Sequence, residues 1–127
     1  RLENKRIRLI NAIPYGSLGS ILKVFDIGYL YYPNDELNNI YCASNKLYEY
    51  ASVGLPMVSY FNPTIHKIFK RERIGICSDD MKSSLLKMKN KLPLYQERLK
   101  AFIRDNSWEN ESKFLLSEVE NLTKQLH

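Results

Sequence analysis

The sequence has few of the features that mark secreted, membrane-spanning or metal-binding proteins. It contains only two cysteines, Cys42 and Cys77, and neither belongs to a Cys-x-x-Cys or cysteine–histidine spacing, so we expect no disulfide framework and no metal ion. No apolar run approaches the roughly 18 residues that cross a bilayer. The basic first residues lead into no apolar segment of the kind found in signal peptides. These absences predict a reduced, cytoplasmic protein.

Other absences narrow the function. No Gly-x-Gly-x-x-Gly follows the first apolar segment, which argues against a dehydrogenase, and there is no internal repeat or low-complexity segment. The 127 residues are 44% hydrophobic and 26% charged, as expected for a single globular domain. That length is short for a complete two-domain enzyme, so we expect the chain to be one part of something larger.

The charge is mildly basic and unevenly distributed. The net charge is +5, with basic residues gathered at the start, around 67–73 and around 82–100, and acidic residues at 105–120. Such clusters would suit a nucleic-acid surface or an anionic membrane. Solvated helix faces explain them equally well and are far more common, so no nucleic-acid partner is expected.

Short apolar runs alternate with segments of helical spacing, which predicts a βαβαβαβ order followed by two or three helices. The run at 27–32 is continuously apolar and ends at Pro33, a pattern typical of a strand buried on both faces. The class is therefore α/β: a Rossmann-like parallel sheet of about four strands with flanking helices. The expected strands are 6–10, 27–32, 57–60 and 74–77; the expected helices are 18–25, 44–53, 64–70, 81–91, one from Pro93 onward, and 106–125.

The last expected helix is long and one-sided. Asn106 and Glu109 have capping-box spacing at its start. We expect Trp108 to anchor this helix against the sheet. Its apolar face would carry Leu115, Val119, Leu122 and Leu126.

Ligands of parallel α/β sheets bind beyond the carboxyl ends of the strands. This rule selects the loops at 11–17, 33–45 and 61–66. Many of the tyrosines, seven of nine, lie between Tyr29 and Tyr60, and packing explains them better than stacking on a ligand. His66, in the third loop, is expected to be structural.

The strongest local signal is the helix expected to begin near Ser44. The unpaired N–H groups and positive dipole end of such a helix suit a diphosphate, and Lys46 would add a charge there. Glu49 follows one turn later, where its carboxylate could reach the hydroxyls of the same ligand. The competing interpretation is a solvated helix in which Glu49 pairs with Lys46.

The segment NKLYEYASVGLPMV, residues 45–58, resembles the Lys-x-x-Glu-Tyr-x-x-x-Gly-x-Pro-Val-Val segment of retaining GT-B glycosyltransferases of group 1, the family-4-like enzymes. Residues 8–15 are similar to the family's strand and loop around the nucleobase, and 25–33 to its Ala-Asp-Val…Pro strand. The later Gly-Ile…Asp segment and the Ser-Trp-Glu that opens the last helix also have counterparts, at 74–80 and 107–109. The similarity covers about residues 7–126 in the same order.

The resemblance implies a donor site for a nucleotide-diphosphate sugar of UDP or GDP type, with no further cofactor. Glu49 would accept hydrogen bonds from the nucleotide ribose hydroxyls. The other residues that the resemblance assigns are Asn45, Lys46 and Leu47, whose backbone N–H groups would meet the diphosphate, and Ala12 and Ile13, whose main chain would meet the base.

The chain also departs from the family pattern. Many members have a second glutamate where this chain has Tyr41, and Asp35 or Glu36 would have to contact the donor sugar instead. The family's diphosphate-binding Arg and Lys, and its acceptor-binding half, have no counterpart. The resemblance thus implies that residues 1–127 form a partial C-terminal donor-nucleotide domain, half of a GT-B fold with a long C-terminal helix, without the N-terminal acceptor domain.

As part of such an enzyme, the chain would help to transfer a sugar to a polysaccharide or glycolipid, at or near the cytoplasmic membrane. It would need the missing domain or a partner chain, and we expect no turnover by the chain alone. Two alternatives stay open: a stand-alone nucleotide-binding or regulatory module, and a basic binder of nucleic acid or membrane surfaces. The last predicts binding that collapses with added salt.

Overall fold

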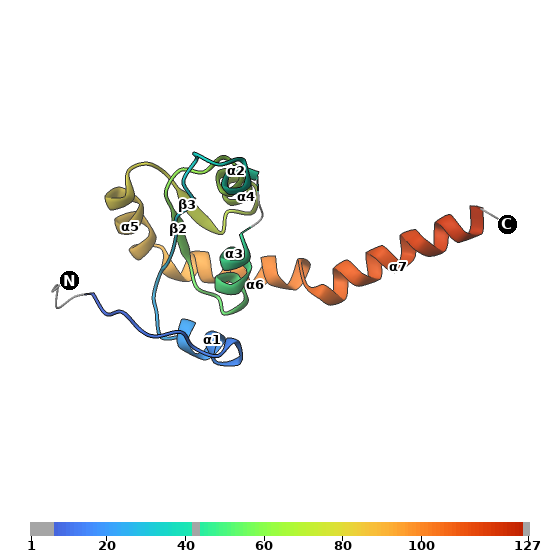
Figure 1. The fold of residues 1–127 in the computed structure, drawn as a ribbon, viewed down its shortest axis with the longest axis horizontal. Coiled ribbons are helices and arrows are strands. Elements are labelled where there is room, and N and C mark those ends of the chain that lie inside the picture. The colour runs from blue at the N-terminus through green and yellow to red at the C-terminus, as the bar shows by residue number, and fades with distance from the viewer. Residues whose placement is uncertain (1–6, 42–43, 126–127) are drawn as a thin grey trace.

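The protein has an α/β fold built on a three-stranded parallel sheet with flanking helices and a long C-terminal helix (Figure 1). A computed structural model describes residues 7–41 and 44–125. The strands lie in the order β1 (Gly28–Leu30), β2 (Met57–Ser59), β3 (Gly75–Cys77). The helices are α1 (Tyr15–Leu22), α2 (Leu37–Tyr41), α3 (Asn45–Ser52), α4 (Pro63–Glu72), α5 (Met81–Lys89), α6 (Leu92–Asp105) and α7 (Trp108–Gln125).

Helices α3 and α4 cover the same face of the sheet. Gly28, Met57 and Gly75 are register partners across the three strands, so they present one face. A Cβ on Gly28 would lie 2.5 Å from the ring of Tyr50 on α3, and a Cβ on Gly75 would collide with the ring of Phe69 on α4. Both strands therefore begin with glycine where an aromatic ring from a crossover helix lies on the sheet.

A single cluster of buried side chains joins this face to α6. Its members are Leu30, Leu47, Ala51, Met57, Ile65, Phe69, Ile74, Leu99 and Phe102. Helix α6 contributes Leu99 and Phe102, and both are buried. Burial of these side chains is the main term that stabilises the fold.

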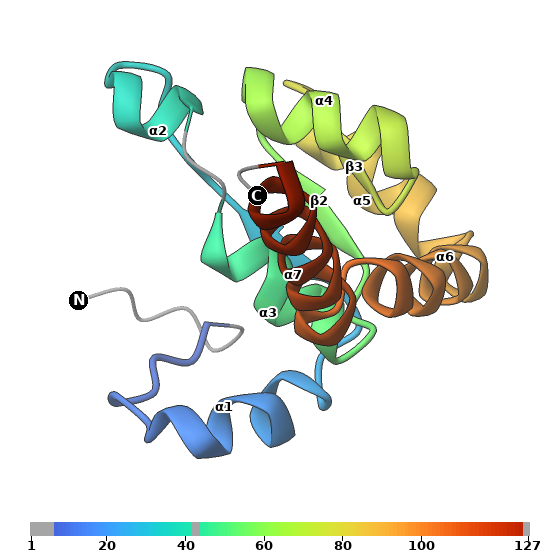
Figure 2. The same cartoon turned by 90° about the vertical axis from the view of Figure 1, so that its right-hand side faces the viewer.

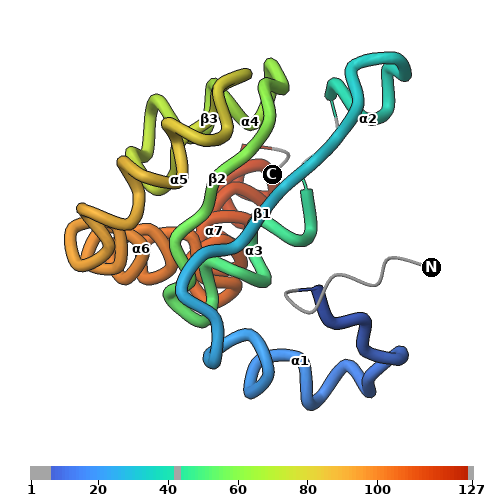
Figure 3. Tube along the Cα trace, turned by 90° about the vertical axis from the view of Figure 1, so that its left-hand side faces the viewer, coloured from blue at the N-terminus to red at the C-terminus, as the bar shows by residue number. Residues whose placement is uncertain are grey.

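The opposite face is only partly covered. Helix α5 lies on the other side of the sheet from α4 (Figure 1) and packs against β2 and β3. On β1, which Figure 3 shows in cyan beside β2, Tyr29 remains half exposed. Its ring stacks on the ring of Tyr31, with centroids 6.4 Å apart, and the Tyr31 ring meets that of Tyr60 edge-on, with centroids 6.0 Å apart. The expectation that this strand is buried on both faces is therefore wrong.

The expected first strand does not form in the part of the chain that the structure describes. Residues 7–14 are irregular, Leu9 and Ile10 are exposed, and the sheet has three strands instead of about four. Arg6, the first residue of that expected strand, lies outside the described residues. Strand geometry depends on hydrogen bonds to a neighbouring strand, and this segment lies beside α1 instead of the sheet (Figure 1).

Helix α2 was not expected, since the sequence predicts a polar loop through Asn39. Two hydrogen bonds from the N-terminal end of α4 hold it in place. The side-chain amide of Asn62 donates to the Asn39 carbonyl at 2.8 Å, and the Thr64 hydroxyl donates to the Ile40 carbonyl. These contacts span more than twenty residues, so local sequence does not reveal them.

Helix α7 extends away from the rest of the molecule (Figures 1 and 2), and none of its described residues is buried. Trp108 is 79% exposed, so the expected anchor against the sheet is wrong. Leu115, Val119 and Leu122 are exposed as well. Leu126 lies outside the described residues.

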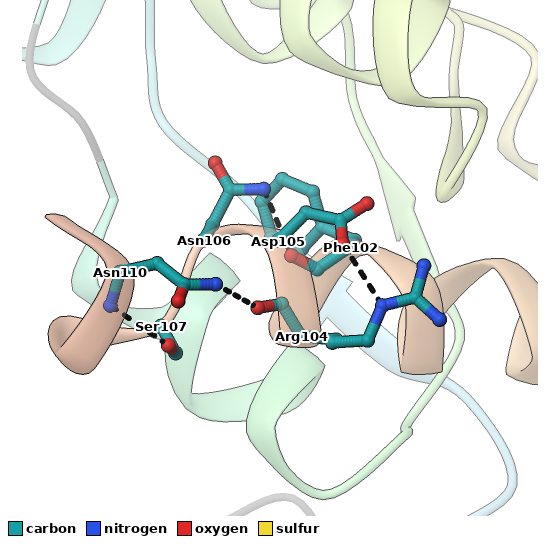
Figure 4. A network of polar contacts seen from close by, with 6 residues as sticks. All are labelled: Phe102, Arg104, Asp105, Asn106, Ser107 and Asn110. Atoms are coloured by element: carbon teal, nitrogen blue, oxygen red, sulfur yellow. Dashed lines mark hydrogen bonds and ion pairs between the residues drawn. The ribbon is translucent and has the colours of Figure 1, made fainter. Parts of the chain in front are cut away.

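The junction of α6 and α7 explains why Asn106 forms no capping box (Figure 4). Its side-chain amide donates to the Phe102 carbonyl at 2.8 Å and so closes α6. Ser107 caps α7 instead, accepting from the Asn110 N–H at 3.2 Å, while the Asn110 amide donates to the Arg104 carbonyl at 2.7 Å. Because α6 ends immediately before α7 begins, Asn106 is engaged by the preceding helix.

Candidate functional site

A cavity of about 550 Å³ lies between α1 and α3, and we call it the α1–α3 pocket. Its α3 wall shows the i, i+3, i+4, i+7 spacing of one helix face. These α3 residues are Asn45, Tyr48, Glu49 and Ser52, and the α1 wall consists of Tyr15, Leu18, Gly19 and Leu22. Two of the residues selected from the sequence, Asn45 and Glu49, thus line one pocket.

The two walls differ in chemistry. The α1 wall is apolar apart from the hydroxyl of Tyr15, whereas α3 contributes an amide, a carboxylate and a hydroxyl. Tyr48 stacks on Phe102 of α6 with ring centroids 6.2 Å apart, which holds its ring in place. The Ser52 hydroxyl donates to the Glu49 carbonyl at 2.7 Å. Asn45 and Glu49 therefore carry the polar groups that a ligand would meet.

Glu49 is half-buried, and its carboxylate forms no ion pair with any residue that the structure describes. The Lys46 ammonium lies over the ring of Tyr32, 5.8 Å from its centroid. A merely solvated helix would favour an ion pair between Glu49 and Lys46. The structure does not contain this pair. Burial raises the pKa of the neighbouring Tyr50 hydroxyl, and the charge of Glu49 raises it further.

The start of α3 lies beside the carboxyl end of β1, as the sequence predicts. Ser44 caps the helix: it is buried, its Oγ accepts from the Leu47 N–H at 3.3 Å, and it is hydrogen-bonded to the Tyr32 hydroxyl at 2.7 Å. Tyr32 follows β1 by two residues. This bond joins the helix N-terminus to the sheet edge where parallel α/β proteins bind ligands.

The three residues expected to meet a diphosphate separate into two groups. Asn45 and Lys46 are exposed in the first turn of α3, where helix N–H groups have no partner within the helix. The side chain of Leu47 is fully buried, and its N–H already donates to Ser44. Asn45 and Lys46 are thus the two whose N–H groups can face a ligand.

Ala12 and Ile13 do not line the α1–α3 pocket. They belong to the irregular segment that leads into α1, with Ala12 exposed and Ile13 half-buried. Asp35, Glu36 and Tyr41 are also exposed and lie outside this pocket, before and within α2.

The second and third of the three predicted loops meet. The Asn34 amide donates to the Phe61 carbonyl at 2.9 Å, and the Phe61 ring lies against His66 at 5.4 Å. The first loop leads into α1. Helix α1 forms one wall of the α1–α3 pocket and is far in the sequence from the other two loops.

Most residues that line the α1–α3 pocket are not among the site residues expected from the sequence. Tyr48 and Ser52 could have been found, because they fall on the same face of the expected helix as Asn45 and Glu49. Tyr15, 79% exposed at the start of α1, lies in the first predicted loop, 11–17, but is not among the residues selected individually. The rest of the α1 wall could not be assigned to the pocket, since its contribution depends on how α1 packs against α3.

Comparisons of this chain with protein-family models, with curated proteins and with solved structures find no match. Within residues 7–41 and 44–125, no helix has the length and apolar character needed to cross a membrane. Among the same residues, no three His, Cys, Asp or Glu side chains gather as a metal ion would require.

Proposed function

We propose that the chain is the donor-nucleotide-binding part of a glycosyltransferase that uses a UDP- or GDP-type sugar and acts on a polysaccharide or glycolipid. The observation that carries the proposal is the presence of Glu49 and Asn45 in one pocket beside the capped N-terminus of α3. The parallel sheet and its crossover helices support a Rossmann-like arrangement, as in one half of a GT-B fold.

Glu49 would recognise the ribose of the nucleotide. A carboxylate can accept hydrogen bonds from two neighbouring hydroxyls at once, and such charge-assisted bonds are stronger than neutral ones. Because the carboxylate is half-buried and has no cationic partner among the described residues, a ribose diol would supply hydrogen bonds that it lacks. The exposed ring of Tyr15 at the same pocket offers a surface on which the base can stack.

The diphosphate would lie at the first turn of α3. The N–H groups of Asn45 and Lys46 and the positive end of the helix dipole favour an anion there. The ammonium of Lys46, which leans over Tyr32, would contribute a further charge.

Sugar transfer requires more than this site provides. A departing diphosphate must be stabilised by cations or hydrogen-bond donors, and the acceptor must be held in line with the donor carbon. Among the residues that the structure describes, no Lys or Arg lines the α1–α3 pocket, and Lys46 is the one cation that we place beside the diphosphate. We therefore expect the chain alone to bind nucleotide without turnover, the acceptor site coming from another domain or chain.

Calorimetric titration with UDP and GDP tests the proposal. Glu49→Gln keeps the side-chain shape but removes the charge, and it should weaken nucleotide binding by about 1 to 3 kcal/mol. Glu118→Gln on the exposed surface of α7 makes the same chemical change outside the pocket and should leave binding unaffected. Equal affinities for the parent chain and Glu49→Gln would remove Glu49 from the site.

A further inference from the structure

A second cavity, of about 400 Å³, lies at the β3 edge of the sheet and is rich in basic side chains. Its cationic lining comes from three segments: Lys70 on α4, Lys87 on α5, and Lys91 at the start of α6. His66 and Tyr95 also line it. We call this cavity the basic pocket. In Figures 2 and 3 these three helices gather at the opposite end of the sheet from α1, so the basic pocket is separate from the α1–α3 pocket.

The positive charge of the basic pocket is not neutralised by the residues described. Within residues 7–41 and 44–125, no Asp or Glu lines the cavity. The ion pairs in the described part of the chain join Arg71 to Glu72, Glu97 to Lys100, and Arg104 to Asp105, so Lys70, Lys87 and Lys91 take part in none of them. All three lysines are exposed. Like charges around one cavity repel one another, and a bound anion would relieve that repulsion.

The remaining wall is compatible with an anion. Burial raises the pKa of the Cys77 thiol, so this lining residue adds no negative charge at neutral pH. β3 is one of the two edge strands of the described sheet. Because the Ser78 N–H donates to the Ser59 carbonyl of β2 at 3.1 Å, the alternation of a β-ladder directs the N–H groups of Cys77 and Gly75 away from β2. Backbone donors thus accompany the lysines.

The chemistry of the lining suits a multiply charged anion such as a phosphoryl group. In the described part of the chain, no arginine lines the basic pocket, so the planar fork that binds carboxylate or phosphate in bidentate fashion is not available and lysines supply the charge. Lysines act as compact point charges, and several of them can surround the oxygens of a phosphoryl group. A cavity of about 400 Å³ holds a small molecule and no folded partner.

We propose that the basic pocket binds a phosphoryl anion with at least two negative charges, such as a diphosphate or a sugar phosphate, at a site independent of the α1–α3 pocket. The proposal does not rest on the proposed function.

Inorganic pyrophosphate is the probe, added to the full chain and followed by calorimetry and by backbone amide NMR shifts. Lys87→Glu should weaken pyrophosphate binding by about tenfold or more, since it removes a charge-assisted contact. Lys89→Glu is the matched control: it lies on the same helix, is exposed, does not line the cavity and changes the net charge equally. The amides of residues 75–77 should shift, and circular dichroism establishes that both variants remain folded.

Equal losses of pyrophosphate affinity in Lys87→Glu and Lys89→Glu would overturn the proposal. They would show that the general positive charge of the surface attracts pyrophosphate, without a defined site. Amide shifts confined to α3 would overturn it as well. Co-sedimentation with phosphatidic acid and phosphatidylcholine vesicles distinguishes the sources of the anion, because the phosphomonoester of phosphatidic acid can carry two negative charges. Lys87-dependent binding of pyrophosphate alone indicates a free phosphate, and Lys87-dependent binding of both pyrophosphate and phosphatidic acid vesicles indicates a lipid headgroup. Vesicle binding without pyrophosphate binding would show that the basic pocket is not a phosphoryl-anion site.

Discussion

Two glycines determine how closely the crossover helices approach the sheet. Gly28 and Gly75 begin β1 and β3, and each has an aromatic ring where its side chain would be. The ring over Gly28 belongs to Tyr50, the immediate neighbour of Glu49. The absence of one methyl group on β1 therefore helps to set the position of the helix that carries the candidate site.

We expect Gly28→Ala to destabilise the protein by about 1 to 3 kcal/mol, the usual cost of forcing an extra methyl group into a packed core. The Tyr50 ring or the α3 backbone must shift, because the new Cβ would lie 2.5 Å from that ring. Urea unfolding followed by circular dichroism measures the change.

Gly16→Ala is the control for this experiment. Among the described residues, a Cβ at Gly16 would meet nothing within 4 Å, and alanine is the better helix former. The free energy of unfolding of Gly16→Ala should therefore be equal to or higher than that of the parent. Similar stabilities for Gly28→Ala and Gly16→Ala would show that the Tyr50 ring does not restrict this position.

Helices α4 and α5 are each capped by a polar residue, but the two caps differ in how many hydrogen bonds they form. Asn62 is buried; its Oδ1 accepts from the N–H groups of Thr64 and Ile65, both at 3.1 Å, and its amide donates to α2. Asp80, the cap of α5, is exposed and accepts from the Ser83 N–H at 2.9 Å. One side chain therefore starts α4 and also holds α2, whereas the other serves its own helix.

Asn62→Ala should lower the free energy of unfolding by about 2 to 4 kcal/mol, since it removes a cap and leaves buried polar groups without partners. Asp80→Ala, the matched loss of an exposed cap, should cost about 1 kcal/mol. Thermal and urea unfolding of the two variants measure the difference. Should Asp80→Ala prove the more damaging change, the structural role assigned to Asn62 would be wrong.

The whole molecule consists of a packed body and a projecting helix. The buried cluster draws its members from residues 30–102, and α7 contributes none of them. Leu99 on α6 is fully buried, whereas Leu115 on α7 is 61% exposed. The stability of the body should therefore not depend on the apolar face of α7.

A pair of leucine truncations tests this division. Leu99→Ala should cost about 2 to 5 kcal/mol, as expected for a cavity in a core, and Leu115→Ala should change the free energy of unfolding by about 0.5 kcal/mol or less. Denaturant unfolding at low protein concentration provides both values. A loss at Leu115 comparable to that at Leu99 would mean that α7 packs against the molecule in solution.

Local patterns in the sequence were sufficient for the central elements. The three strands at 28–30, 57–59 and 75–77 fall inside the expected ones, because their short apolar runs are bounded by turn residues. Helix α5 begins at Met81, the first residue of the expected helix 81–91, and α3 begins at Asn45, as expected for a helix that starts near Ser44. Within the site, Asn45 and Glu49 share a pocket because helical spacing alone places them on one face.

The sequence by itself thus determined the α/β class, the parallel orientation of the strands and the polar face of α3, since each can be recognised from local patterns: short apolar runs separated by helical segments, and the spacing of polar residues within one helix. The tertiary structure alone decided the rest. It placed α1 as the second wall of the pocket, formed α2 through bonds from Asn62 and Thr64, left residues 7–14 without a strand partner, and engaged Asn106 with α6. These features depend on which distant segments meet, and the energy of such contacts is not encoded in the periodicity of any one segment.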